Sequence, residues 1–287
     1  MIFKNNGFFG LLDIKGKLII PNKFQSIDEV KKGYVAARTD IGLGIINLKD
    51  EIIIPFKFSY LSILDNGLLF AFKETNESKM GIINSLNEVL IKPGYDWIFS
   101  INNDFVHLRS NHLFGLIDKN CKFILPVEFE EIGQNQEGLI KLGKNKKYGF
   151  ANEKGEIVIP LIYDEVNDFS EGLAAVLKDG KWGFINVKGQ VIIDFKYVGF
   201  VDSFKNGFAS FRKRDFSSLN SLENDELKLL NRKGDIVKVG KYDVVSVDSN
   251  KNYIVIINKE KFVINRKGKI IAKLNQEKYP DSLDKVY

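Results

Sequence analysis

The stretch KWGFINVKGQVIIDFKY, from Lys181 to Tyr197, decides the fold because most of the chain repeats its pattern. The pattern begins with a bulky residue, then Gly, two apolar residues, and Asp or Asn. Six copies contain this Gly, and two degenerate copies at 227–231 and 261–265 lack it. Successive copies are spaced by 34, 37, 34, 34, 34, 45 and 34 residues. A fixed period of this size indicates an array of one small structural unit. The repeat glycines are Gly10, Gly44, Gly81, Gly115, Gly149 and Gly183.

A tight turn follows each repeat glycine. The third residue after it is Asp or Asn in all copies, and the sixth is Gly in most, as in Asn186 and Gly189. Asp and Asn side chains hydrogen-bond the backbone of turns, and Gly adopts positive φ without a steric penalty. Apolar runs flank the turn on both sides. Each copy is therefore expected to open with a β-hairpin.

Two further positions recur after the turn. Pro occupies the eleventh position after the glycine in four copies, as at Pro160, and is expected to end or bend the second strand. The fourteenth position is aromatic in the first seven copies, which predicts a buried ring in each unit. A second Gly turn and a third strand then complete the unit, and a second strand that breaks at its Pro would make it four strands. The recurring aromatic residues are Phe24, Phe58, Tyr95, Phe129, Tyr163, Tyr197 and Tyr242.

The fifth and sixth copies resemble the bacterial WG-repeat (KWG) family. The resemblance rests on Glu171-Gly172-Leu173-Ala174, on Lys181-Trp182-Gly183, and on the Ile-Pro-x-x-Tyr-Asp block from Ile159 to Asp164. The periodicity extends it over most of the chain, although only Trp182 supplies a Trp before the glycine. The resemblance implies a β-rich repeat array that acts as a binding scaffold.

The expected fold is all-β, with essentially no helix. It is an antiparallel meander of about eight repeats of about 34 residues and about 24 strands, because all connections are short. Residues 1–287 are expected to form a single array, with degenerate capping repeats at 228–287. Caps of this kind favour an elongated, superhelical array, since closed rings need none. A closed β-propeller is the alternative.

Composition places the chain among ordinary globular proteins. Of its 287 residues 44% are hydrophobic, and there is one cysteine, Cys121, so no intrachain disulfide can form. This cysteine usage fits a reducing compartment. The N-terminus has no secretory signal pattern, and no apolar run is long enough for a membrane span. We therefore expect a cytoplasmic protein, a monomer without cofactors.

The residues that could carry chemistry are sparse. His107 and His112 are the only histidines, and no second ligand pair accompanies them, so no metal site is expected. Cys121 occupies the turn position that Gly, Asp or Asn fills elsewhere, which indicates a turn residue and not a nucleophile. The acidic run from Asp164 to Glu171 lacks the spacing of a calcium loop. No catalytic, cofactor-binding or metal-binding residue is predicted, and the chain is not expected to be an enzyme.

Two interruptions break the period. Residues 215–226 carry most of the extra length between the sixth and seventh copies and are expected to form a surface insertion. Three extra residues also occur near Asn76-Glu77-Ser78. Loops of such composition are commonly exposed, so passive insertions are the plainer interpretation and partner contacts the alternative.

Charge is also uneven along the chain. Residues 228–273 contain twelve Lys or Arg against four Asp or Glu, whereas residues 128–171 contain five against ten. Solvated strand faces explain such clusters most simply. The main functional hypothesis is a non-enzymatic scaffold that binds an unknown protein or peptide. The alternative is a polyanion- or glycan-binding module that uses the basic C-terminal third. Nucleic acid is not expected as a partner, because Lys outnumbers Arg there and no aromatic stacking surface accompanies it.

Overall fold

The structure is a computed structural model that describes residues 1–100, 102–213, 227–239, 242–247, 252–257, 260–265 and 270–274. The described residues form 31 β-strands and no helix. They divide into two compact units, residues 1–134 (unit 1) and 135–287 (unit 2), and the division lies within strand β16 (Glu131–Gln136). All paired strands run antiparallel. The all-β, antiparallel repeat fold predicted from the sequence is confirmed.

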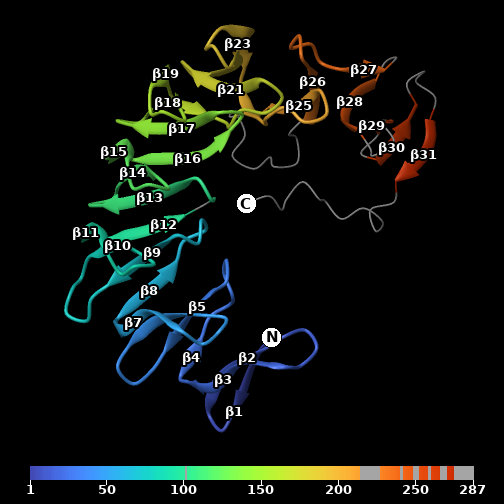
Figure 1. Cartoon of the computed structure of the whole chain (residues 1–287). Helices are drawn as coiled ribbons and strands as arrows, with labels where there is room; N and C mark the ends of the chain where they lie inside the picture. Colours follow the sequence, from blue (N-terminus) through green and yellow to red (C-terminus); the bar gives the residue numbers. More distant parts are fainter. Residues whose placement is uncertain are drawn as a thin grey trace, which may run out of the picture. The chain divides into compact units, whose positions relative to one another are not determined.

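Unit 1 contains four sheets whose strands follow chain order (Figure 1). The first sheet has three strands and the next three have four each. The strands are β1 (Ile2–Asn5), β2 (Phe8–Leu12), β3 (Leu18–Phe24); β4 (Ser26–Ile27), β5 (Tyr34–Arg38), β6 (Leu43–Asn47), β7 (Ile52–Phe58); β8 (Tyr60–Ile63), β9 (Leu69–Lys73), β10 (Met80–Asn84), β11 (Val89–Tyr95); β12 (Trp97–Ser100), β13 (Phe105–Ser110), β14 (Leu113–Asp118) and β15 (Phe123–Phe129).

Unit 2 continues the pattern with two further four-stranded sheets, the first beginning with β16. The degenerate copies give a three-stranded sheet, β24 to β26, and a five-stranded sheet, β27 to β31. The strands are β17 (Leu139–Lys144), β18 (Lys147–Asn152), β19 (Ile157–Tyr163); β20 (Glu165–Val166), β21 (Leu173–Lys178), β22 (Lys181–Asn186), β23 (Val191–Tyr197); β24 (Gly199–Val201), β25 (Phe208–Lys213), β26 (Leu227–Asn231); β27 (Lys238–Val239), β28 (Tyr242–Val247), β29 (Tyr253–Ile257), β30 (Glu260–Ile264) and β31 (Ile270–Leu274).

Each complete sheet has four strands, so the expectation of about 24 strands with three in each unit was too low. The proline does not break its strand: β19 runs through Pro160 to Tyr163. The additional strand lies after the recurring aromatic residue and can be as short as two residues, as in β20. A two-residue strand gives too little alternation to be recognised from one sequence. It is nevertheless paired, because Val166 lies opposite Val176 of β21.

The repeat glycine lies in the middle of the third strand, not in a turn. Between the third and fourth strands the register shifts twice, so the fourth strand bulges over the glycine. A Cβ atom on Gly81 would lie 2.5 Å from the carbonyl oxygen of Ile91, and one on Gly183 would lie 2.7 Å from that of Ile193. Such distances exclude a side chain. Close approach of the bulged backbone is therefore the physical reason for the glycine in the motif.

The turn after the glycine is fixed by its Asp or Asn. In the sixth copy, Asn186 Oδ1 accepts hydrogen bonds from the backbone N–H groups of Lys188 and Gln190 at 3.0 Å each. The residue six positions after the repeat glycine has positive φ, which explains Gly189 (φ 76°) and its counterpart Cys121 (φ 61°). This confirms the tight turn expected from the sequence and the assignment of Cys121 as a turn residue.

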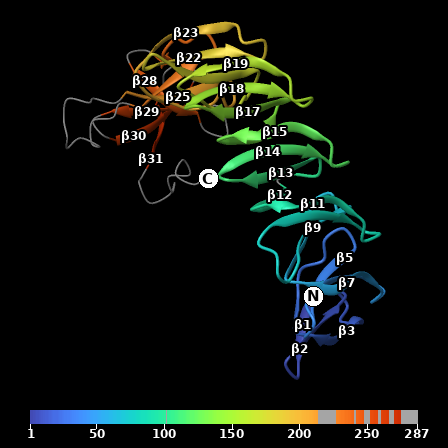
Figure 2. The same ribbon diagram turned by 90° about the vertical axis from the view of Figure 1, so that its left-hand side faces the viewer.

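Successive sheets within each unit pack face to face and share their core. In unit 1, one buried cluster joins Leu11 and Ile20 of the first sheet to Val35 and Ile46 of the second. The next cluster joins the second sheet to the third, and another joins the third to the fourth. Figure 2 shows these sheets from β1–β3 to β12–β15 in chain order. A single repeat cannot bury both of its faces, so each sheet relies on its neighbours.

Five of the recurring aromatic rings are buried, from 2% exposure for Phe24 and Phe58 to 6% for Tyr163 and Tyr197, with Phe129 at 3%. Tyr242 belongs to β28, and the structure describes only its backbone.

Tyr95 is the exception, because it is only half-buried. In two other copies the equivalent ring is covered by the residue that lies twelve positions after the next repeat glycine. Phe56 stacks on Phe24 with ring centroids 5.7 Å apart, and Phe195 stacks on Tyr163 with ring centroids 6.4 Å apart. Beside Tyr95 the equivalent residue is Val127, which covers less of the ring.

A candidate interaction surface along the third-to-fourth strand turns

Exposed aliphatic side chains recur where the fourth strand of each sheet begins. The eighth residue after the repeat glycine is exposed in every copy of unit 1, at 53% for Leu18, 62% for Ile52, 53% for Val89 and 47% for Phe123. Ile157 and Val191 occupy the same position in unit 2, with 54% and 46% exposure. The fourth strand lies at the edge of its sheet, and its pairing with the third strand is interrupted by a bulge. The first residue of the aliphatic run therefore points into solvent although the residue two positions later is buried, as in Ile52 and Ile54.

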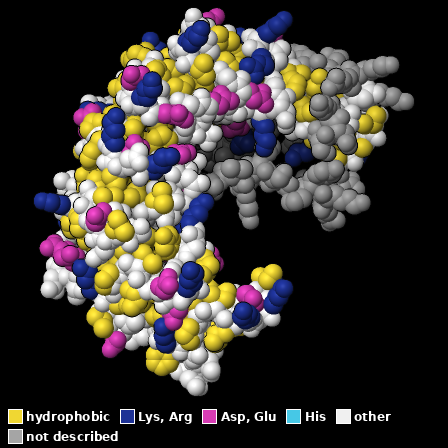
Figure 3. Space-filling view, in the orientation of Figure 1, with side chains coloured by type: hydrophobic (Ala, Val, Ile, Leu, Met, Phe, Trp, Pro, Cys, Tyr) yellow, Lys and Arg dark blue, Asp and Glu magenta, His cyan; other side chains and the backbone are white. Residues whose placement is uncertain are grey.

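The turns that precede these positions in unit 1 add further apolar side chains. Ile14 is 92% exposed, Leu86 75% and Leu48 39%. We call residues 14–18, 48–52, 85–90 and 119–123 the turn edge. Single exposed apolar residues are normal on protein surfaces, but here they recur at the same repeat position in successive hairpins, which makes the turn edge a candidate interaction surface. The space-filling view shows hydrophobic side chains reaching the surface of unit 1 among charged ones (Figure 3).

Neighbouring hairpins of the turn edge are tied together. The ammonium group of Lys23 in β3 lies 2.5 Å from a carboxylate oxygen of Asp50 in the following turn. Cys121 of the fourth turn packs, like Ile91 and Tyr95 of β11, against the buried core that the third and fourth sheets share. The exposed side chains therefore recur at equivalent positions of hairpins that belong to one stack of sheets.

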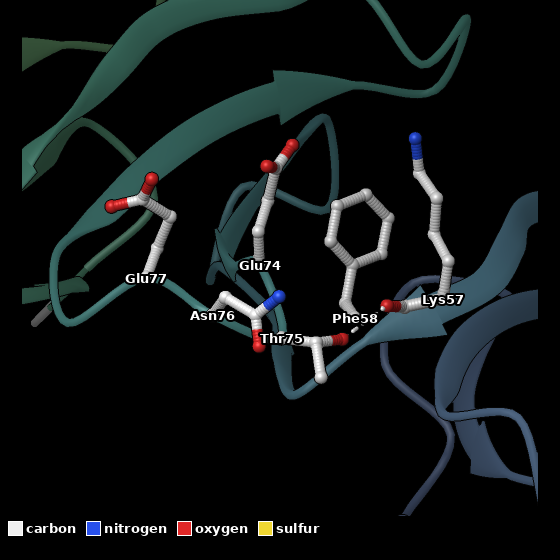
Figure 4. Close-up of a pocket in the computed structure, with 6 residues that line it drawn as sticks. All are labelled: Lys57, Phe58, Glu74, Thr75, Asn76 and Glu77. Carbon is white, nitrogen blue, oxygen red and sulfur yellow. Dashed lines mark hydrogen bonds between the residues drawn. The ribbon is translucent and has the colours of Figure 1, made fainter.

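A separate shallow pocket of about 350 Å³ lies where three extra residues break the period in unit 1. It is lined by Lys57, Phe58 and residues 74–77, whose side chains are drawn in Figure 4. The Lys57 ammonium group lies 5.0 Å from the centroid of the Phe58 ring, and Thr75 Oγ1 donates a 3.1 Å hydrogen bond to the Lys57 carbonyl oxygen. The extra residues are thus anchored to the preceding sheet. The six lining residues include no His or Cys, and the one hydroxyl, that of Thr75, donates its proton to the backbone of Lys57 and not to a carboxylate.

The two histidines lie in different surroundings. His107 is buried at 3% exposure and stacks on Phe99 with ring centroids 5.0 Å apart. Burial lowers the pKa of His107 to about 4, so the ring is neutral at physiological pH. His112 lies in a positive-φ turn, and its Nδ1 atom is 3.1 Å from a guanidinium nitrogen of Arg109. The two rings do not form a common site.

Cys121 is a poor nucleophile. Burial, together with the neighbouring carboxylate of Asp118, raises the pKa of its thiol to about 11. The described residues hold no group of three or more His, Cys, Asp and Glu side chains placed to bind a metal ion. None of the described residues belongs to a helix that could cross a membrane.

The acidic run at the start of the sixth sheet is used within the fold. The Asp164 carboxylate lies 2.6 Å from the Lys147 ammonium group, and Glu171 accepts a 2.8 Å hydrogen bond from the backbone N–H of Gly207. Arg232, from the basic C-terminal region, donates to the carbonyl oxygen of Glu171 at 2.8 Å. Part of the charge in both regions therefore joins repeats to one another. Residues 215–226 lie outside the described residues.

The turn edge is not among the sites that the sequence predicts. Leu18-Ile19-Ile20, Ile52-Ile53-Ile54 and Val191-Ile192-Ile193 are aliphatic triplets, and an edge strand can bury only part of such a run, which is the signal that the sequence carries. Which residue of the triplet is exposed depends on the bulge of the strand.

The repeated sheets and their shared cores define a β-repeat protein. The family model described as WG containing repeat matches residues 9–40, 44–76, 80–106, 114–148, 148–182 and 182–215. The chain therefore belongs to the WG-repeat family, as the resemblance predicted. No curated protein matches the sequence.

Solved structures show a distant likeness. A eukaryotic initiation factor is 10% identical, with 95% of this chain and 83% of that chain covered and a TM-score of 0.40. BamB from Moraxella catarrhalis is 10% identical, with 96% and 87% covered and a TM-score of 0.35. Virginiamycin B lyase from Staphylococcus aureus is 15% identical, with 85% and 92% covered and a TM-score of 0.31. At these values the likeness carries no information about function.

Proposed function

We propose that this protein is a cytoplasmic, non-enzymatic scaffold that binds a partner protein through the turn edge. The observation that carries this proposal is the row of exposed aliphatic side chains, one or more from each successive hairpin of unit 1. Side chains that serve only folding have no reason to recur in solvent at the same repeat position. A partner that covers them gains the free energy of removing apolar surface from water.

The expected contribution of each side chain is moderate. Full burial of a Leu, Ile or Val side chain contributes about 1.5–3 kcal/mol, so covering a half-exposed one contributes about 1 kcal/mol. On a row that spans four hairpins, the binding free energy is therefore the sum of several moderate contributions and does not depend on one deep pocket. This is how repeat proteins commonly bind extended partners.

A catalytic role has less support. The histidines belong to different surroundings, the thiol of Cys121 has a raised pKa, and the one hydroxyl that lines the pocket, that of Thr75, donates to the Lys57 carbonyl oxygen. Catalysis needs such groups within hydrogen-bond reach of one another.

Quantitative affinity purification from the native host tests the proposal. The bait is the full chain, the test variant is Ile52→Ser with Val89→Ser, and the matched control is Leu68→Ser, because Leu68 is 61% exposed but lies outside the turn edge. Thermal unfolding of all three verifies that the variants are folded. We expect the partner to be recovered with the wild type and the control and depleted with the double variant. Equal recovery with all three would refute the proposed surface.

A further inference from the structure

The charges of the turn edge are arranged so that its carboxylates are engaged and its ammonium groups are not. In the second and third hairpins, Glu51 accepts a 2.6 Å hydrogen bond from the Asn47 side-chain amide, and Glu88 accepts a 2.7 Å bond from that of Asn84. Asp50 is held by the ion pair with Lys23. Each carboxylate within the turn edge therefore has a partner, in its own turn for the exposed Glu51 and Glu88 and in the preceding sheet for Asp50.

The lysines of the turn edge behave differently. Lys15, Lys17, Lys49, Lys119 and Lys122 are exposed, and their ammonium groups make no ion pair or hydrogen bond within the described part of the chain. Uncompensated ammonium groups around an apolar surface favour a partner with carboxylates and oppose a basic one.

The two kinds of side chain also occupy different places. The first and fourth hairpins each provide two lysines, whereas the third provides none and contains Leu86, Val89 and Leu90, all exposed. Exposed apolar side chains thus occur in all four hairpins, whereas the lysines concentrate at the two ends of the row. Face-to-face sheets are spaced by about 10 Å, so four hairpins extend over about 30 Å. An extended peptide covers that length with about nine or ten residues.

The backbone of the edge strand does not favour strand addition. Pro21, Pro55, Pro93 and Pro126 interrupt the row of donors on the last strand of each sheet of unit 1, and the pairing of each of these strands is irregular. Proline and bulges on an edge strand hinder pairing with another chain. Recognition must therefore use side chains across successive hairpins and not main-chain bonds along one strand.

We propose that the turn edge binds an extended polypeptide segment of about nine or ten residues with an aliphatic centre and acidic residues on both sides. This inference rests on the proposed function and specifies the partner of the same surface.

Selection of peptides from a random library of about twelve residues, displayed on phage and panned on the full chain, tests the inference. The selected peptides are then measured by fluorescence polarisation against four proteins: the wild type, Lys15→Glu with Lys122→Glu, Ile52→Ser with Val89→Ser, and the control Leu68→Ser. We expect enrichment of peptides with Asp or Glu flanking Leu, Ile or Val. Affinity should fall at least tenfold with either double variant, stay within twofold with the control, and weaken as salt rises.

Each other result has a definite meaning. The acidic partner is overturned if basic or uncharged peptides are enriched, or if the selected peptides bind the lysine variant as tightly as the wild type. The proposed surface still stands in that case if the Ile52→Ser with Val89→Ser variant loses binding. Peptides insensitive to both double variants overturn the surface as well. If no peptide is enriched, the polypeptide partner is overturned. In that case, binding to vesicles of phosphatidylcholine and phosphatidylserine that is lost in both double variants would reassign the surface to membranes.

Discussion

Replacing the repeat glycine by alanine should destabilise the fold strongly, whereas the same change elsewhere in the same hairpin should not. Gly81 lies in β10 below the bulge of β11, and a Cβ atom there would be 2.5 Å from the Ile91 carbonyl oxygen and 2.8 Å from the Phe72 ring. The added methyl group would meet backbone on one side and the buried Phe72 ring on the other, and neither can move aside without disturbing the sheet. Overpacking of this kind costs about 2–3 kcal/mol. For a chain of this size that corresponds to a fall of roughly 3–5 °C in Tm.

Gly94 in β11 is the matched control. A Cβ atom there would meet no atom closer than 3.8 Å, and its φ is not in the left-handed region. Gly94→Ala should therefore leave the free energy of unfolding within about 0.5 kcal/mol or raise it slightly, because alanine restricts the unfolded chain. Urea and thermal unfolding of both variants measure the contrast. A Gly81→Ala variant as stable as the wild type, or equal losses for both, would refute the close-approach explanation of the repeat motif.

Three further predictions concern individual side chains. His107→Leu should make the free energy of unfolding less sensitive to acid. The His107 imidazole has a pKa of about 4 in the folded protein against 6.5 in the unfolded chain, so the unfolded chain binds its proton first and the wild type loses up to about 3 kcal/mol of stability as pH falls from 6.5 to 4. Urea titrations of both proteins at pH 7 and pH 4 would detect the difference. Trp182→Phe should lower the free energy of unfolding by about 1–2 kcal/mol, since the indole N–H donates a 2.9 Å bond to the Gly199 carbonyl oxygen; an unchanged Tm would contradict this. Cys121 in the folded protein should react with iodoacetamide at pH 8 about a hundredfold more slowly than an ordinary cysteine, because its pKa of about 11 leaves little thiolate; mass spectrometry of the alkylated protein would show a comparable rate if this is wrong.

Much of the fold could be predicted because the repeat samples the same local physics many times. The turn after each repeat glycine was readable from Asn186 and Gly189, since an amide acceptor and a positive-φ residue at fixed spacing define it. The buried rings were readable from their recurrence. The two-residue strand β20 was not, because pairing with β21 is decided by tertiary structure and not by local pattern.

The role of the repeat glycine and the turn edge needed the structure. Gly183 could have been a turn residue or a bulge partner, and only the register shift against β23 distinguishes the two. Likewise, Ile52 and Ile54 look equivalent in the sequence, but the first is 62% exposed and the second fully buried. The bulge decides which residue of the run reaches solvent, and a sequence pattern with a period of two does not record it.

Photo-crosslinking in living cells tests the central claim most directly. A photoreactive amino acid is placed at Ile52 in the turn edge or at Leu68, which is 61% exposed against 62% for Ile52 but lies outside the edge. Because exposure is matched, random encounters label both positions equally. We predict a discrete crosslinked partner from Ile52, absent from Leu68 and lost when Val89→Ser is added. Equal crosslinking from both positions, or none from Ile52, would contradict the claim that the turn edge is the binding surface.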